Sequence, residues 1–254
     1  MRSCVDIVRR RLKERKVSGR VFNFTVGLLN EYLKFPSAKN SLYTGSDINQ
    51  CLIQLSLSQG YAESGLANLS EKCGRQNNVS TGRTFRGRTE RLPEGHVRDS
   101  LTGANDHVIR ILKGYGVFWR KAVVAIDYAR PPFYGDPNAM RARSDLYFGF
   151  ATNIPKSSAT HLPIFIPQEY RRRWGIETGY RVQDNVQAKT TSTNYTLRLL
   201  YRMTSVLLYN VWHYANLLLC KALKTRFKKP LLKLTSLAVH FENLIICGLG
   251  PPRH

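Results

Sequence analysis

The longest apolar stretch of the chain, residues 195–219, limits most strongly how this sequence can fold. Its apolar side chains fall on all sides of a helix rather than along one stripe, which is typical of a buried helix. Residues 203–219 carry no formal charge, yet they include Asn210, His213 and Asn216. A membrane-spanning helix needs about 20 predominantly apolar residues. We therefore predict a core helix that other elements must cover, and no membrane span.

Positive charge is the second constraint. The 254 residues contain 39 Lys and Arg against 17 Asp and Glu, a net charge of +22, and the apolar content of 43% is globular. Basic clusters recur at 9–16, 83–91, 171–173 and 221–233. Such a charge favours a polyanion as partner, nucleic acid first and an anionic membrane surface second. Because the clusters span the chain, a nucleic acid lying across the protein is favoured over a local targeting signal.

The cysteines indicate the cellular compartment. There are five, far apart in the sequence and without a C-x-x-C pair, which argues against a zinc site and against a disulfide framework. The first residues are basic and lack the apolar core of a signal peptide. We therefore expect an intracellular protein in a reducing compartment.

Three segments flank or precede the central region. Residues 1–70 are predicted to be a mostly helical N-terminal region, whose basic surface either binds DNA or is simply solvated. Residues 71–95 are rich in Arg, Gly, Asn and Thr, which predicts a basic linker that either follows phosphates or is merely exposed. Residues 221–254 form a basic C-terminal tail, in which Pro230 ends any helix.

The central region, residues 96–220, combines both periodicities. A helix is predicted at 96–113 with a break near Gly103, followed by a short apolar run, AVVAI, at 122–126. Such a run is typical of a strand buried on both faces. Asp127 ends this run, and because an unpaired buried carboxylate is costly, it is a candidate metal ligand. A second, aromatic strand is predicted at 145–153.

A helix predicted from Tyr170 to about residue 188 begins with the sequence YRRRWGIE. At 100° per residue, one side of it carries Tyr170, Arg173, Glu177, Arg181 and Asp184. One interpretation is a surface helix with i,i+4 ion pairs between Glu177 and the arginines on either side. The other is an acid that shares a divalent metal ion with Asp127, while the arginines bind phosphates.

Two segments resemble a known family. The pattern Y-x-x-R-x-x-x-E, met by Tyr170, Arg173 and Glu177, resembles the Tyr-Arg-Glu-Lys signature of DDE transposases from bacterial and archaeal insertion sequences. The wider run 170–212 is similar to the C-terminal part of that catalytic domain. AIDYARPPFYGDP, residues 125–137, is similar to the segment around the family's first catalytic Asp. Together the resemblance covers residues 115–215.

The resemblance implies a mixed α/β fold class: a partial RNase H-like sheet flanked by helices within 96–220, preceded by the helical N-terminal region. It implies DNA strand cleavage and transfer, with Asp127 and Glu177 as catalytic residues and ligands of two Mg²⁺ or Mn²⁺ ions. The implied DNA-binding residues are Tyr170, Arg171, Arg172, Arg173, Arg181 and Lys189. The implied partner is the element's end DNA with its terminal inverted repeats, bound by one chain or by a homodimer, in the nucleoid of a prokaryotic cytoplasm.

The sequence departs from the family in two places. The position of the family's lysine holds Asp184, and Lys189 lies five residues further on. Only 49 residues separate Asp127 from Glu177, and none of their acids has the strand-end context expected of a second catalytic Asp. An internal deletion between about Asn138 and Asp145 accounts for this and predicts a truncated, defective transposase. The alternative function is a non-catalytic, basic DNA-binding protein, either a transposase remnant or a regulator of an intact element.

Overall fold

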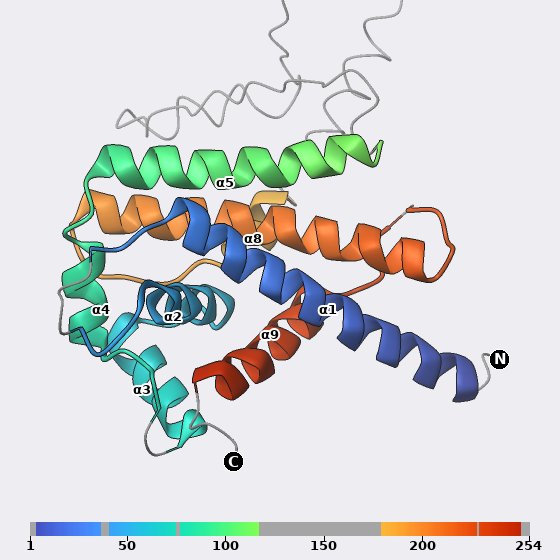
Figure 1. Cartoon of the computed structure of the whole chain (residues 1–254), viewed down its shortest axis with the longest axis horizontal. Coiled ribbons are helices and arrows are strands. Elements are labelled where there is room, and N and C mark those ends of the chain that lie inside the picture. The colour runs from blue at the N-terminus through green and yellow to red at the C-terminus, as the bar shows by residue number, and fades with distance from the viewer. Residues whose placement is uncertain (1–3, 37–40, 75–76, 117–178, 228, 250–254) are drawn as a thin grey trace, which may run out of the picture. The chain divides into compact units, whose positions relative to one another are not determined.

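The structure is a computed structural model that describes residues 4–36, 41–74, 77–116, 179–227 and 229–249. The chain divides into two units, residues 1–119 with 182–254, and residues 120–181. The first unit holds the helices labelled in Figure 1. They are α1 (Cys4–Tyr32), α2 (Gly45–Leu57), α3 (Ala62–Cys73), α4 (Gly82–Thr89), α5 (Glu94–Gly114), α8 (Tyr195–Ala222) and α9 (Leu234–Leu249).

The predicted α/β fold class, with its partial RNase H-like sheet, is wrong. In the described ranges the regular elements are all helices, with no strand or sheet; an isolated bridge between Tyr61 and Lys189 is the β feature found there. The physical reason is that amphipathic helices cover the apolar surface of α8 directly, so no sheet is needed to bury it. The strands expected at 122–126 and 145–153 lie outside the described residues.

α8 is the central helix of this unit, and it confirms the buried helix predicted at 195–219. It lies alongside α5, and α1 crosses it and reaches α5 with its last turn (Figure 1). Its side chains Leu200, Leu207 and Val211 are fully buried. Asn210 Nδ2 donates a hydrogen bond to Asn105 Oδ1 of α5 at 2.8 Å, so this polar group is satisfied at the helix contact. None of the helices described here has the length and apolar character of a membrane span.

α5 runs without interruption through Gly103, so the break predicted there does not occur. The glycine has a packing role instead. A Cβ atom at this position would lie 2.8 Å from Cε1 of Tyr32, so only glycine lets α5 approach the end of α1 this closely. The Tyr32 hydroxyl group is 3.3 Å from Nδ1 of His107, one turn further along α5.

The segment 71–95, assigned to a basic linker, contains α4. Phe85 of α4 is fully buried, and the Thr81 hydroxyl oxygen caps the helix by accepting a hydrogen bond from the Thr84 N–H at 3.2 Å. Gly82 packs directly on the start of α3, where a Cβ atom would lie 2.5 Å from Cα of Glu63. Arg83, Arg86 and Arg88 of this segment are therefore carried by a helix packed on α3.

We expect Gly82→Ala to lower the free energy of unfolding by about 1–3 kcal/mol, because the added methyl group meets the Glu63 backbone, which cannot rotate away. Gly87→Ala, in the same helix, is the matched control: a Cβ atom there meets nothing within 4 Å. Since alanine is the better helix former, the control gains up to about 1 kcal/mol. Urea denaturation of both variants measures the difference, and similar changes in the two would contradict the close approach.

Candidate nucleic-acid interface

The first half of α1 carries a stripe of positive charge. Residues 9–20 include seven basic residues and one acid. Arg9, Lys13, Lys16 and Arg20 recur at helical spacing along one side, and all but the half-buried Lys13 are exposed. Like charges one turn apart destabilise a helix by a few tenths of a kcal/mol per pair. The stripe therefore weakens α1 by itself, and a polyanion beside it would relieve that cost.

The connection between α8 and α9 is the second basic segment. Residues 221–233 contain six basic residues and no acid. α8 ends where Lys224 adopts a left-handed conformation (φ 53°), and the Thr225 N–H then donates to the carbonyl oxygen of Cys220 at 2.9 Å. Lys224, Arg226 and Lys229 are exposed on this connection. The segment thus presents cations to solvent without a neighbouring acid of its own.

Packing brings these two segments together. Lys13 Nζ donates to the carbonyl oxygen of Ala222 at 2.6 Å, and Arg10 Nη2 donates to that of Leu231 at 2.8 Å. The last carbonyl groups of a helix lack intrahelical partners and carry the negative end of its dipole, so the end of α8 offers an acceptor for Lys13, whereas Leu231 lies in the connection that follows α8. Figure 1 shows the first turns of α1 and the end of α8 at the same end of the unit.

Aromatic side chains join the same surface. Lys221 Nζ lies 3.6 Å from the ring centre of Tyr115, which follows α5 and is 40% exposed. Burial raises the pKa of Tyr214; Tyr115 adds to this shift and Arg20 opposes it, so these groups are neighbours. We use the name basic face for this surface. It consists of Arg9, Lys13, Lys16, Arg20, Lys221, Lys224 and Tyr115.

A buried amide fixes the connection in place. Asn216 of α8 is fully buried, and its Oδ1 accepts hydrogen bonds from the N–H groups of Leu231 and Leu232, both at 2.7 Å. Its Nδ2 donates to the carbonyl oxygens of Trp212 (3.0 Å) and Leu232 (3.2 Å). Trp212 Nε1 also donates to Leu232 O at 2.8 Å. These bonds fix residues 231–232 against α8. The basic connection that precedes them therefore both begins and ends beside this helix.

We expect Asn216→Leu to lower the free energy of unfolding by about 2–4 kcal/mol, because it leaves the half-buried N–H of Leu231 and the buried N–H of Leu232 without acceptors. Thermal or chemical denaturation followed by circular dichroism measures the loss. Asn243→Leu, at an exposed position of α9, is the control and should change stability by no more than about 0.5 kcal/mol. Equal effects at the two positions would contradict the role given to Asn216.

Most of the residues implied by the family resemblance fall outside the described part of the chain. These are Asp127, Tyr170, Arg171, Arg172, Arg173 and Glu177. Arg181 and Lys189 are described, and both are exposed. Residues 179–184 are helical, so the helix expected to run to about residue 188 ends at Asp184.

The end of that helix has a packing reason. Val186 and Ala188 are buried, and the Lys189 N–H donates to the carbonyl oxygen of Gly60 at 3.0 Å, which holds the chain in an extended form. Asp184, at the position of the family's lysine, pairs with Arg202 Nη1 of α8 at 2.7 Å. Lys189, Asp184 and Arg202 line a cavity of about 700 Å³. Lys189 is therefore near other charged groups but is not part of the basic face.

Sequence reasoning identified both basic segments of the basic face but not their contact. It missed Tyr115 as a partner of Lys221, and it treated Asn216 only as a polar interruption. The available signal for Asn216 was an amide within an otherwise apolar, buried helix, because such a group must find hydrogen-bond partners.

Two further findings bear on function. Within the part of the chain that the structure describes, no three His, Cys, Asp or Glu side chains form a group that could hold a metal ion. Family models, curated proteins and solved structures were compared with the chain, and none of them matches it.

Proposed function

We propose that this chain is a DNA-binding protein whose basic face contacts the phosphate backbone. The observation that carries the proposal is the contact between Lys13 and Ala222, which places the stripe of α1 beside the basic end of α8. Glu14, the one acid within residues 9–20, is already engaged by Arg10 at 2.8 Å. The exposed cations of the basic face are thus left to attract an external polyanion.

The chemistry of the basic face favours contacts with the backbone rather than with base edges. Lysine and arginine side chains on an exposed helix neutralise phosphates and release counterions, which gives affinity with little sequence information. Tyr115 adds a ring on which an unpaired base could stack. We therefore expect binding to duplex DNA of any sequence, weakening steeply as salt is added.

The resemblance of residues 115–215 to insertion-sequence transposases makes a mobile DNA element the biological context of this proposal. Our proposal covers binding and includes no cleavage step, because the sequence has no match for the family's second catalytic Asp. It is the function of a transposase remnant, or of a regulator that occupies the DNA of an intact element.

The test compares two triple variants that remove equal charge. Arg9→Gln/Lys16→Gln/Arg20→Gln removes exposed cations of the basic face, whereas Lys34→Gln/Arg83→Gln/Arg91→Gln removes exposed cations near the far end of α1 and around α4. Each lost phosphate contact lowers the slope of log affinity against log salt by about 0.9, so the first variant should lose about 2–3 units. The control should keep the slope within about one unit. Fluorescence anisotropy with a labelled duplex, from about 50 to 200 mM salt, measures both.

Equal losses in the two variants would show that net charge, and not the basic face, attracts DNA. Absence of binding at about 0.1 M salt would reject the proposal altogether. Mg²⁺-dependent cutting of element-end DNA, lost in Asp127→Asn and Glu177→Gln, would instead identify a working transposase.

A further inference from the structure

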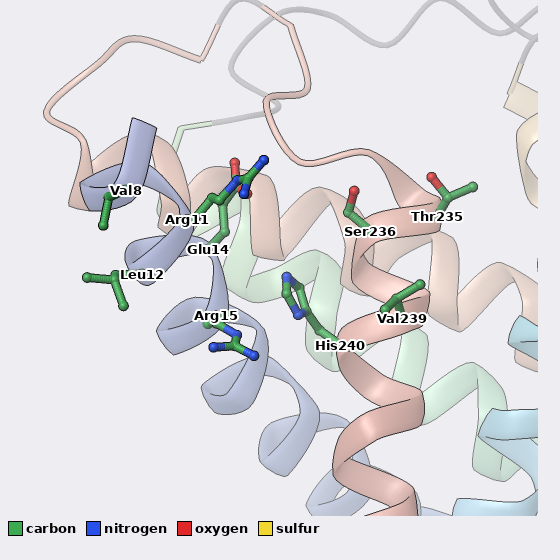
Figure 2. A pocket seen from close by; sticks show the side chains of 9 residues that line it. All are labelled: Val8, Arg11, Leu12, Glu14, Arg15, Thr235, Ser236, Val239 and His240. Atoms are coloured by element: carbon green, nitrogen blue, oxygen red, sulfur yellow. The ribbon is translucent and has the colours of Figure 1, made fainter. Parts of the chain in front are cut away.

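A second charged surface lies on another side of α1 from the basic face. There, a groove with a volume of about 580 Å³ separates α1 from α9 (Figure 2). The helical spacing of α1 sends Arg11 and Arg15 towards this groove, whereas Arg9 and Lys16 belong to the basic face. The DNA-binding proposal does not use this groove.

The groove is edged by apolar side chains that remain in water. Val8 and Leu12 of α1 are 56% and 61% exposed, and Val239 of α9 is 55% exposed. By contrast, Leu237 and Phe241, next to Val239 on α9, are buried in the core. Exposed apolar residues gathered around a groove mark an interaction site more often than an isolated exposed leucine does.

Within the described part of the chain, the charges of the groove that are left without an ion pair are positive. Figure 2 shows the Arg11 and Arg15 side chains extending from α1 towards α9, and the His240 ring extending from α9 towards α1. Among the described residues neither arginine forms an ion pair, and the lining carboxylate, Glu14, is held by Arg10. Burial lowers the pKa of His240, Arg15 lowers it further, and Glu14 opposes the shift. An occupant that brings carboxylates would therefore meet two guanidinium groups without displacing an existing pair.

We propose that this groove binds an acidic amphipathic helix of a partner protein. A helix laid in this groove would direct its carboxylates between α1 and α9 and place its flanking apolar side chains on the two edges. Its leucine-like residues would cover Val8, Leu12 and Val239, and its carboxylates would pair with Arg11 and Arg15. One ligand of this class thus matches both the apolar and the cationic side chains of the groove.

Other occupants fit the groove less well. Nucleic acid would neutralise the arginines but leave the three apolar side chains in water. A second copy of the chain would bring another net charge of +22 to a surface that is already cationic. An anionic bilayer is broad and flat, whereas the two arginines face into the space between the helices.

The probe is a synthetic helix-forming peptide with glutamate along the face that enters the groove and leucine along both edges of that face, in a fluorescence anisotropy assay. A second peptide has glutamine in place of every glutamate. The protein variants are Arg11→Gln/Arg15→Gln in the groove and Arg9→Gln/Lys16→Gln on the basic face, which remove equal charge from the same helix. We expect the groove variant and the glutamine peptide each to weaken binding about tenfold or more, and the basic-face variant about twofold or less.

A site-specific readout accompanies the affinities. When the glutamate peptide binds, the NMR signals of His240 should shift and its pKa should rise, because carboxylates offset the field of Arg15. A peptide held elsewhere by general charge attraction would leave His240 unchanged. Circular dichroism melting confirms that both variants fold, which surface Arg→Gln changes permit.

Each alternative result would overturn the proposal. Equal weakening by the two protein variants would indicate general charge attraction, and undiminished binding of the glutamine peptide would remove the acidic requirement. Binding of phosphatidylserine-containing vesicles through Arg11 and Arg15, without peptide binding, would assign the groove to a membrane. Self-association lost in the groove variant, again without peptide binding, would assign it to a second copy. Because the groove and the basic face lie on different sides of α1, peptide and DNA binding should fail in different variants.

Discussion

The hydrogen bonds of Asn216 to the backbone of residues 231–232 are the interaction on which the surfaces of this protein depend. They sit at the point where the chain, having left the end of α8, returns to it. From there α9 packs on α1, with the rings of Phe22 and Phe241 5.2 Å apart. One buried amide thus determines the path of the basic connection, which borders the basic face. It also determines the position of α9, which forms one wall of the groove. Its cost of burial is offset because donor and acceptor are both used in full.

The cations of α1 divide into structural and exposed groups. Arg10 and Lys13 donate to the carbonyl oxygens of Leu231 and Ala222, so their charges help to hold α1 on the end of α8. Arg9, Lys16 and Arg20 remain exposed, and their mutual repulsion opposes folding of the helix that carries them. This repulsion lowers the stability of the free protein slightly, and a bound polyanion would offset the loss. Arg11 and Arg15 lie on the groove side, where exposed apolar residues accompany them, and there we propose a protein ligand instead.

The sequence predicted the buried helix at 195–219 well, because an all-round apolar pattern has few other outcomes. It did not predict α9, although Leu237, Phe241, Ile245 and Leu249 recur every four residues and are buried. Gly103 was misleading, because a glycine that permits close helix packing resembles one that ends a helix. The expected sheet was wrong for the described residues, where helices cover the core. The catalytic roles of Asp127 and Glu177 stay predictions, and Lys189 lies in a separate cavity beside Asp184 and Arg202.

The sequence by itself determined that α8 would be buried, that the chain would be strongly basic, and that its cations would lie in separate clusters. These properties follow from local periodicity and from charge counts. Only the tertiary structure decided which clusters meet, because Lys13 and Ala222 are 209 positions apart and no local pattern encodes their contact. The tertiary structure also decided that two cationic sides of α1 lie beside different neighbours. The physical reason is that each side is defined by its neighbour: the end of α8 for the basic face, and α9 for the groove.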